Sequence, residues 1–174
     1  MRGKPRNACM IEITKLHERL VKLLRQDARL TDGKLSTMLG ISEDEVAKER
    51  KILEDGGVIC GYTAIVNEAL LNPQSITAII EIKTSPNKKY GYAGIASTIS
   101  RFPNVESVRL MSGNYDLAIT VKCDDIRQVG KFVDEQLSVL DGVLGTATHF
   151  IIGRYKEMGM ELSPDEDERG MVSP

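Results

Sequence analysis

Cysteine and histidine are scarce in this chain of 174 residues, which contains three cysteines and two histidines. The cysteines, Cys9, Cys60 and Cys123, are odd in number and form no C-x-x-C pair, so the sequence indicates neither a disulfide framework nor a zinc site. No second histidine, cysteine or paired carboxylate lies near His149 in the sequence, and His17 is far away. We therefore predict no metal ion, and we interpret His149 as a hydrogen-bonded interior or interface residue.

Long apolar runs and the common catalytic fingerprints are also missing. No apolar stretch is long enough to cross a membrane, and the first ten residues, MRGKPRNACM, lack the apolar core of a signal peptide. There is no G-x-S-x-G motif, no P-loop and no dinucleotide fingerprint. With so few cysteines, a reducing cytoplasm is the simplest location. We expect a cytoplasmic protein that is not an enzyme and has no cofactor.

The formal net charge is only −2, which argues against a strongly basic nucleic-acid binder. The charge is unevenly distributed, however. Arg2, Lys4 and Arg6 make the N-terminal arm basic, whereas residues 165–168 form an acidic run. Because local patches matter more than the total for contact with nucleic acid, the composition leaves DNA binding open.

The stretch 35–62 has the pattern of a helix-turn-helix. Gly40 stands where a tight turn between helices needs a residue without a Cβ atom. Ser42 is a strong N-cap, and Glu45 three residues later completes a capping box. Gly56-Gly57 ends that helix. The apolar contacts come from Leu35, Leu39, Ile41, Val46 and Leu53.

The first part of the chain therefore predicts three short helices and a small wing. Thr14 caps a helix that runs to about Ala28, with leucines at helical spacing. The second and third helices span about 31–39 and 42–55. Val58-Ile59 then begins an extended segment, which we interpret as the first strand of a wing. Three short helices bury little apolar surface, so this unit is expected to pack against a partner chain.

After residue 75 the composition changes and strands alternate with helices in the order β-α-β-β-α-β, the ferredoxin-like pattern. The expected strands are 76–84, 105–111, 116–122 and 143–155, and the expected helices are 92–102 and 126–140. Both helices cover one face of the sheet. The other face is expected to carry Leu144, Phe150 and Ile152 or the residues that alternate with them. Such a face is too apolar to be solvated, so we predict a dimer built sheet to sheet.

The segments LGIS and LEDGGVICGYTA resemble the helix-turn-helix of the Lrp/AsnC (feast/famine) transcriptional regulators, and the resemblance extends from about Ile13 to Lys156. It implies an α+β fold with an N-terminal winged helix-turn-helix domain and a C-terminal ferredoxin-like domain for effector binding and oligomerisation. It also implies dimers that assemble into octamers. The expected division of the chain is a flexible arm (1–12), a DNA-binding domain (13–64), a strand end with a hinge (65–75), an effector domain (76–156) and an acidic tail (157–174) that is disordered after Gly159.

The third helix is the expected recognition helix for double-stranded DNA. The candidate DNA-binding residues are Lys34, Thr37, Ser42, Lys48, Arg50 and Lys51, together with the basic arm. Family members usually have an arginine followed by a branched apolar residue where this chain has Glu49-Arg50. Arg50 thus falls at a position expected to be buried: either the helix is rotated, or Arg50 bends out to phosphate. The acidic first turn, Glu43-Asp44-Glu45, favours the helix dipole but repels phosphate.

A second candidate site is the loop Ser112-Gly113-Asn114-Tyr115-Asp116, which resembles the G-x-x-D loop of the family's effector module. Gly113 permits an unusual backbone angle, exposed N–H groups suit a carboxylate, and Asp116 suits an amino group. Together these groups suit a free amino acid. The alternative is a simple hairpin turn capped by the aspartate. Gln136, Thr146 and Thr148 of a neighbouring subunit are expected to complete the pocket.

Two other functions remain open from the sequence. Siroheme decarboxylases resemble this architecture and bind a tetrapyrrole between the domains, and His149, Arg109 and Arg154 are the features in their favour. The other function is that of a sensor or interaction protein that has lost DNA binding, for which the acidic turn at residues 43–45 is the main argument.

Overall fold

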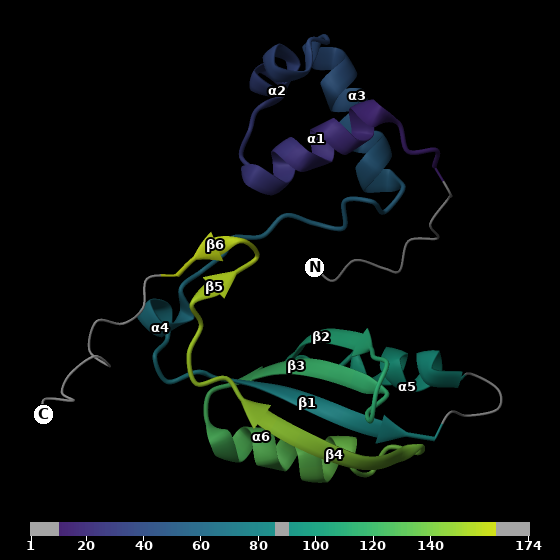
Figure 1. The fold of residues 1–174 in the computed structure, drawn as a ribbon, viewed down its shortest axis with the longest axis vertical. Helices are drawn as coiled ribbons and strands as arrows, with labels where there is room; N and C mark the ends of the chain where they lie inside the picture. The colour runs from purple at the N-terminus through teal and green to yellow at the C-terminus, as the bar shows by residue number, and fades with distance from the viewer. Residues whose placement is uncertain (1–10, 86–90, 163–174) are drawn as a thin grey trace, which may run out of the picture. The chain divides into compact units, whose positions relative to one another are not determined.

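The computed structural model describes residues 11–85 and 91–162, which form two compact units divided between Ala64 and Ile65. The first unit contains three helices, α1 (Lys15–Gln26), α2 (Asp32–Leu39) and α3 (Glu43–Asp55) (Figure 1). The three helices predicted from the sequence are thus confirmed. None of the described helices is long and apolar enough to span a membrane.

Local capping sets where these helices begin and end. The Thr14 hydroxyl accepts the N–H of His17 at 3.2 Å, and His17 Nδ1 accepts the N–H of Thr14 at 3.3 Å, so a histidine takes the usual place of glutamate in a capping box. Ser42 Oγ accepts the N–H of Glu45 at 3.2 Å and begins α3. Gly40 ends α2 with φ of 75°, a left-handed angle that glycine adopts without strain. The core beneath consists of Leu20, Leu24, Leu35, Leu39, Val46 and Leu53.

The predicted wing strand is wrong, because residues 58–67 form no strand in the structure. The N–H groups of Val58 and Ile59 both donate to the carbonyl of Leu53, at 2.9 and 3.0 Å. These amides complete the C-terminus of α3, so they are not free to pair with another strand. The segment predicted as a hinge contains a single helical turn, α4 (Glu68–Leu71).

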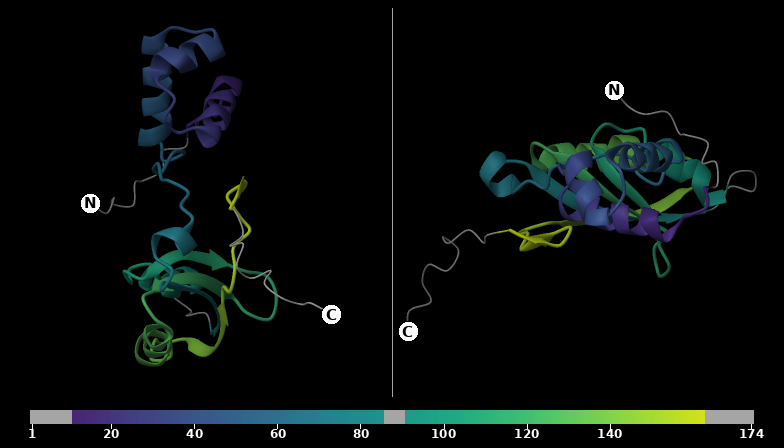
Figure 2. Two further views of the ribbon diagram at one scale, coloured as in Figure 1. Left: turned by 90° about the vertical axis from the view of Figure 1, so that its left-hand side faces the viewer. Right: turned by 90° about the horizontal axis from the view of Figure 1, so that it is seen from above.

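The second unit contains the predicted β-α-β-β-α-β order, which confirms the ferredoxin-like fold. Its elements are β1 (Ile76–Thr84), α5 (Gly91–Ile99), β2 (Val105–Leu110), β3 (Leu117–Cys123), α6 (Ile126–Phe132) with a π-helical continuation η1 (Val133–Leu137), and β4 (Val143–Phe150). The four strands form an antiparallel sheet in the order β2-β3-β1-β4. The left-hand view of Figure 2 shows α6 end-on beside one face of this sheet.

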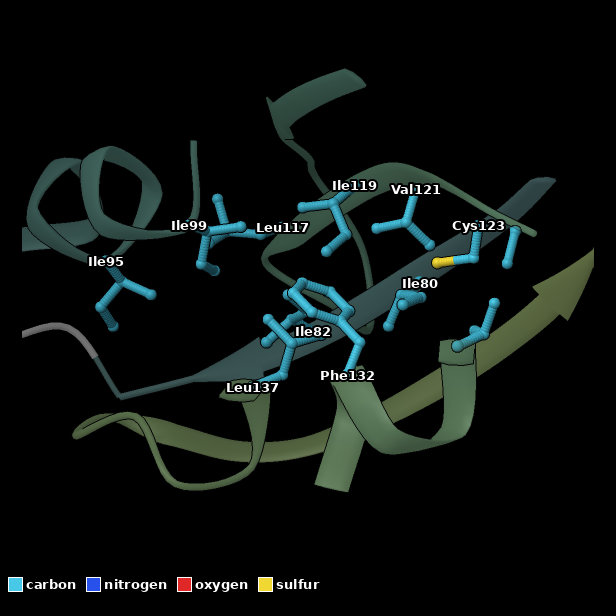
Figure 3. Packing of buried hydrophobic residues seen from close by; sticks show 12 residues of the cluster. Ile80, Ile82, Ile95, Ile99, Leu117, Ile119, Val121, Cys123, Phe132 and Leu137 are labelled. Carbon is cyan, nitrogen blue, oxygen red and sulfur yellow. The ribbon is translucent and has the colours of Figure 1, made fainter. Parts of the chain in front are cut away.

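The core of this unit lies between that face and the helices. Alternate residues of the two central strands point into it, which is the period-two pattern of a strand with one buried face. The buried side chains are Ala78, Ile80, Ile82, Leu117, Ile119, Val121 and Cys123 from the strands, and Ile95, Ile99, Val129, Phe132 and Leu137 from the helices (Figure 3). Phe102 and Phe132 meet edge to face, with ring centroids 5.4 Å apart.

The end of the unit differs from the sequence-based prediction in two respects. The last helix is α-helical only to Phe132 and continues as the π turn η1. The last strand was predicted to reach residue 155, but β4 ends at Phe150, because its partner β1 begins at Ile76 and offers almost no further backbone to pair with. A short hairpin of β5 (Lys156–Glu157) and β6 (Met160–Glu161) follows, and β6 lies inside the segment predicted to be a disordered tail. The rest of that tail, 163–174, and the arm residues 1–10 lie outside the described residues.

The face of the sheet turned away from the helices, here called the open face, is not the apolar surface that was predicted. Directly paired residues share a face, and Phe150 pairs with the fully buried Ala78, so Phe150 lies on the helix side. Leu144 lies at a register shift between Val143, which pairs with Thr84, and Gly145, which pairs with Lys83, so the strand pairing does not place it on the open face. Ile152 lies beyond β4. The open face carries Thr77, Ile79, Glu81, Lys83, Ser107, Arg109, Ala118, Thr120, Lys122, Gly145, Ala147 and His149.

Candidate DNA interface and effector loop

Helix α3 has an inward and an outward face. Val46 and Leu53 are fully buried, and Glu49 and Arg50 on the same side are half-buried. The opposite side, at helical spacing, is exposed. It carries Asp44, Ala47, Lys48 and Lys51, here called the outward face of α3. The two candidate lysines of α3 therefore project together from the unit.

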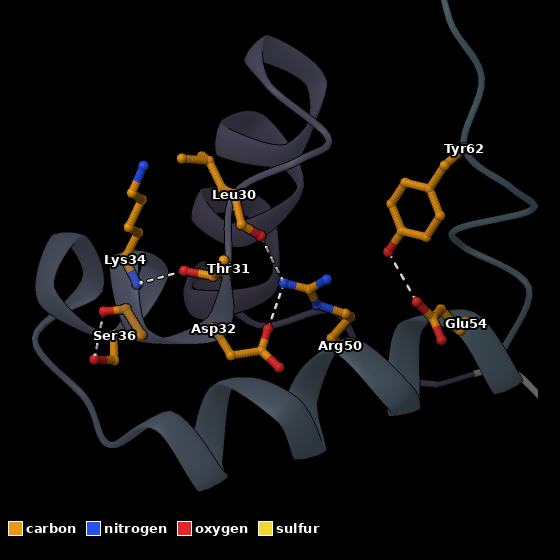
Figure 4. Close-up of polar contacts among 9 residues, drawn as sticks. Leu30, Thr31, Asp32, Lys34, Ser36, Arg50, Glu54 and Tyr62 are labelled. Atoms are coloured by element: carbon orange, nitrogen blue, oxygen red, sulfur yellow. Dashed lines mark hydrogen bonds and ion pairs between the residues drawn. The ribbon is translucent and has the colours of Figure 1, made fainter.

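Arg50 stays on the inward side of α3. The sequence suggested either a rotated helix or an Arg50 side chain that bends out to phosphate, and neither describes its position. Its guanidinium forms an ion pair with Asp32 at the start of α2 and donates to the carbonyl of Leu30 at 3.3 Å (Figure 4). The helix accommodates a charge at a buried position because Asp32 compensates it. The proposal that Arg50 contacts phosphate is therefore corrected: this side chain joins α3 to the connection between α1 and α2.

We expect Arg50→Ala to lower the free energy of unfolding of the first unit by about 2 kcal/mol, because Asp32 and the Leu30 carbonyl lose their partner. The value is below that of a fully buried pair, since the two side chains are 21% and 28% exposed. Urea denaturation followed by circular dichroism measures it. The matched control is Lys51→Ala, which removes an exposed ion pair with Asp55 and should cost less than about 0.5 kcal/mol. Equal effects of the two changes would contradict the assignment.

Glu49, the neighbour of Arg50, also makes a contact within its own unit. Its Oε2 lies 2.6 Å from Nε2 of His17, which is buried in α1. Because His17 Nδ1 already accepts the N–H of Thr14, Nε2 carries the proton and donates to Glu49. Glu49 therefore joins α3 to α1, and Arg50 joins α3 to α2. Only the amphipathic spacing of α3 pointed to these roles, and the partners were not visible in the sequence.

The remaining DNA candidates lie on the exposed surface of α2 and α3. Ser42 caps α3, and Thr37 donates to the carbonyl of Gly33 at 3.2 Å. Lys51 pairs with Asp55 at 2.9 Å. Lys34 and Lys48 are exposed, and within the described part of the chain their ammonium groups form no ion pair. The basic arm is outside the described residues.

The acidic first turn of α3 is partly turned against the protein. A Cβ atom built on Gly33 would lie 3.4 Å from Oε2 of Glu43, so this carboxylate lies against the first turn of α2. Carboxylates at the N-terminus of a helix interact favourably with its dipole. This contact gives Glu43 a role within the unit.

The predicted effector loop connects β2 and β3. Gly113 adopts φ of 138°, so the expectation of an unusual backbone angle is confirmed. Ser112, Gly113 and Asn114 are exposed, whereas Tyr115 and Asp116 are half-buried. The loop is closed by the N–H of Met111, which donates to the carbonyl of Asp116 at 2.8 Å. The loop is therefore a hairpin connection with an exposed tip and an anchored base.

Asp116 is held by groups of its own chain. Its Oδ2 accepts the N–H of Thr84 at 2.8 Å, and its Oδ1 lies 3.4 Å from Lys83 Nζ and 3.5 Å from the Tyr92 hydroxyl. These donors, the Thr84 amide first, lower the pKa of the Asp116 carboxyl group below its usual value. Asp116 is thus an anion in a fixed position beside β1. A role as partner of a ligand's amino group requires this, and so does a role as the cap of a simple hairpin turn.

The other effector candidates are not brought to the loop within one chain. Thr146 and Thr148 pair with Ile82 and Ile80 on β4, and β1 lies between β4 and the strand that follows Asp116. Two strand spacings amount to about 10 Å. Gln136 is exposed in η1, and within residues 11–85 and 91–162 no hydrogen bond joins these three side chains to the loop. Their participation requires a neighbouring subunit.

The residues that favoured a tetrapyrrole enzyme do not form one cluster. His149 Nε2 lies 3.2 Å from Glu81 on the open face, and Arg154 donates to Thr77 at 2.6 Å. Arg109 lies on β2, at the opposite edge of the sheet from the histidine on β4. Among the described residues no group of three or more His, Cys, Asp or Glu side chains is arranged to hold a metal ion.

Known proteins match this chain over nearly its whole length. Residues 77–160 match the Lrp/AsnC ligand binding domain. The chain is 34% identical over 166 residues to an uncharacterized HTH-type transcriptional regulator, YugG of Bacillus subtilis, and the match covers 94% of this chain and 100% of that protein. Its fold resembles that of the transcriptional regulator NMB0573 of Neisseria meningitidis, solved as an L-Met complex, with a TM-score of 0.68, 22% identity and coverage of 87% and 97% of the two chains.

A further structure of the same fold is E. coli AsnC, with a TM-score of 0.65, 18% identity and coverage of 84% of this chain and 97% of that one. The sequence relatives are named as transcriptional regulators and not as enzymes, so the enzyme alternative is set aside. The three-helix unit with its outward lysines and the ferredoxin-like unit with its G-x-x-D loop agree with these matches. The chain belongs to the Lrp/AsnC family and is a DNA-binding transcriptional regulator.

Proposed function

We propose that this regulator is a cytoplasmic homo-oligomer that binds DNA through α3 and changes its DNA affinity when a free amino acid binds at the loop 112–116. In this proposal residues 13–64 are the DNA-binding domain and 76–156 the effector domain. The segment 65–75, with the turn α4, connects them. The observation that carries the proposal is the outward face of α3, where Lys48 and Lys51 project together from a helix-turn-helix.

DNA contact follows from the position of α3 in the motif. The second helix of a helix-turn-helix enters the major groove, and lysines on its exposed side reach phosphates. Lys48 and Lys51 occupy that side, and Lys34 and Thr37 lie exposed on α2. The acidic first turn weakens attraction to phosphate, but Glu43 lies against α2 and two lysines follow within two turns. These features support moderate, salt-dependent affinity.

Self-association is supported by apolar side chains that one chain leaves exposed. In the second unit these include Leu70 and Leu71 of α4, Ile79 at the centre of the open face, and Ile152 and Tyr155 after β4. A single chain exposes these groups at a cost, and a second copy covers them by an isologous contact. A dimer also presents two recognition helices to two half-sites. The octamer implied by the family is the corresponding expectation for the full assembly.

The amino-acid effector is supported by the geometry of the loop. The exposed backbone of Ser112, Gly113 and Asn114 offers N–H groups to a carboxylate, and the anionic Asp116 at its base suits an ammonium group. The matched family domain is a ligand-binding domain, and the similar regulator of Neisseria meningitidis was solved with L-Met. Gln136, Thr146 and Thr148 would then reach the ligand from a neighbouring subunit.

The test is binding of the full chain to DNA from the region upstream of its own gene, at low and at raised salt, with and without the standard amino acids. We expect selective binding that weakens as salt rises and that one amino acid changes. Selective binding that no amino acid alters would reject the effector. An absence of selective binding even at low salt would favour a sensor that has lost DNA binding.

A further inference from the structure

The ion pair between Lys83 and Asp116 is long, at 3.4 Å, and is not needed to hold the aspartate in place. Asp116 is already anchored, because its Oδ2 accepts the Thr84 amide at 2.8 Å. Its other oxygen, Oδ1, has only two distant donors among the described residues, Lys83 Nζ at 3.4 Å and the Tyr92 hydroxyl at 3.5 Å. Charge-assisted hydrogen bonds to carboxylates are usually about 2.7–2.9 Å long. Oδ1 is therefore the oxygen at which a better donor can replace an existing one.

We propose that Lys83 occupies the ammonium position at Asp116 in the free protein and binds the α-carboxylate of the effector in the bound protein. In this exchange the ligand's ammonium group takes the place of Lys83 at Asp116 Oδ1, and the released Lys83 ammonium pairs with the ligand's carboxylate. The inference rests on the proposed amino-acid effector and assigns a specificity-determining residue to that site. Neither the loop motif nor its spacing pointed to Lys83.

The lysine is free to move, whereas the aspartate is not. Lys83 is 44% exposed and Asp116 only 15%. On the open face Lys83 is paired with Gly145 of β4, where an added Cβ atom would meet nothing within 4 Å, so there is space beside it. An ion pair this long, whose lysine is exposed, contributes little to stability, and its opening costs little. The flexible four-carbon stem of lysine lets the ammonium group follow a ligand.

The exchange selects zwitterions because only a zwitterion leaves no charged group at the site without a partner. One ion pair, Lys83 with Asp116, is replaced by two, each formed with one end of the amino acid. A ligand with only an ammonium group leaves Lys83 without a partner, and a ligand with only a carboxylate cannot displace it from Asp116. A charged hydrogen-bond partner left unmatched at such a site costs enough to change affinity by about 10-fold. Lys83 therefore adds to the discrimination between an amino acid and its ester.

The experiment measures binding by isothermal titration to the full-length protein. The probes are the standard amino acids and, for the one that binds, its methyl ester, which keeps the ammonium group but has no carboxylate charge. In the unmodified protein the amino acid should bind about 10-fold or more tightly than the ester. In Lys83→Met this preference should shrink by about 10-fold, through weaker binding of the amino acid and equal or tighter binding of the ester. Lys83→Arg should retain most of it.

The matched control is Lys122→Met, which removes another lysine of the open face, one that pairs with Glu68 at 2.7 Å and lies near the other end of β3. It should leave the preference unchanged. If an amino acid binds and Lys83→Met keeps the full preference over the ester, the role of Lys83 is wrong while the effector site stands. If no amino acid binds the unmodified protein, the proposed effector and this inference both fail. Melting temperatures of all variants show whether each is folded.

Discussion

Replacing Lys48 and Lys51 together by glutamate should weaken DNA binding by about 100-fold or more at moderate salt. Both lysines lie on the outward face of α3, and each change reverses one charge per subunit beside the phosphates. The salt dependence should also become less steep, by about one unit of slope for each phosphate that the protein no longer neutralises. Titration of labelled operator DNA at several salt concentrations measures both quantities.

Two controls separate a direct role at the DNA from effects of net charge and of stability. Lys131→Glu with Lys156→Glu makes the same change in net charge on exposed lysines of the other unit and should leave the salt slope unchanged. The change at Lys51 removes its pair with Asp55, so the helix content of the variant must be checked by circular dichroism. If a folded double variant bound DNA as tightly as the unmodified protein, α3 would not be the recognition helix.

Leu53→Ala should strongly destabilise the first unit and leave the stability of the second one unchanged. Leu53 is fully buried among the three helices, and truncation of a buried leucine costs about 3 kcal/mol. A core of so few residues has little stability to spare. We expect DNA binding and part of the helical signal to be lost at a lower temperature than in the unmodified protein, while binding of an effector at the sheet unit persists at that temperature. Thermal unfolding should show two transitions, of which the first moves to lower temperature.

The comparison for this change is Met38→Ala, which truncates an apolar side chain on the surface of α2. Met38 is exposed, so its removal should cost less than about 0.5 kcal/mol. A single transition for Leu53→Ala, with the sheet unit unfolding at the same temperature, would show that the two units unfold together. The structure divides them at Ala64 and Ile65, which favours separate transitions.

Much of this fold was predictable because its signals are local. Thr14, Ser42 and Gly40 act within three or four residues of their own positions, so a cap or a left-handed turn can be recognised without the rest of the protein. The alternation in β1 and β3 likewise follows from one buried face of a sheet. The unusual angle at Gly113 belongs to the same class, because a turn demands it.

The errors concern features that depend on a distant partner. Val58 and Ile59 have the composition of a strand, but their amides complete α3 and no neighbouring strand in the described part of the chain receives them. The length of β4 is set by the start of β1, and the side on which Phe150 lies is set by its register with Ala78. A register cannot be read from one strand alone, so the predicted apolar open face was wrong.

The candidate sites divide in the same way. The lysines of α3 were identified from position in a helix, because the period of the helix places them on its exposed side. The charge at Arg50 was visible in the sequence, but only the approach of Asp32 and Leu30 from another segment decided that it turns inward. Asp116 was expected as a ligand of an amino group, yet its contact with Lys83 arises from the pairing of β1 with β3. Helix caps and turns are determined by residues close together in the sequence. The partner of a charged side chain and the face on which a strand residue lies depend on contacts that form only when distant segments pack.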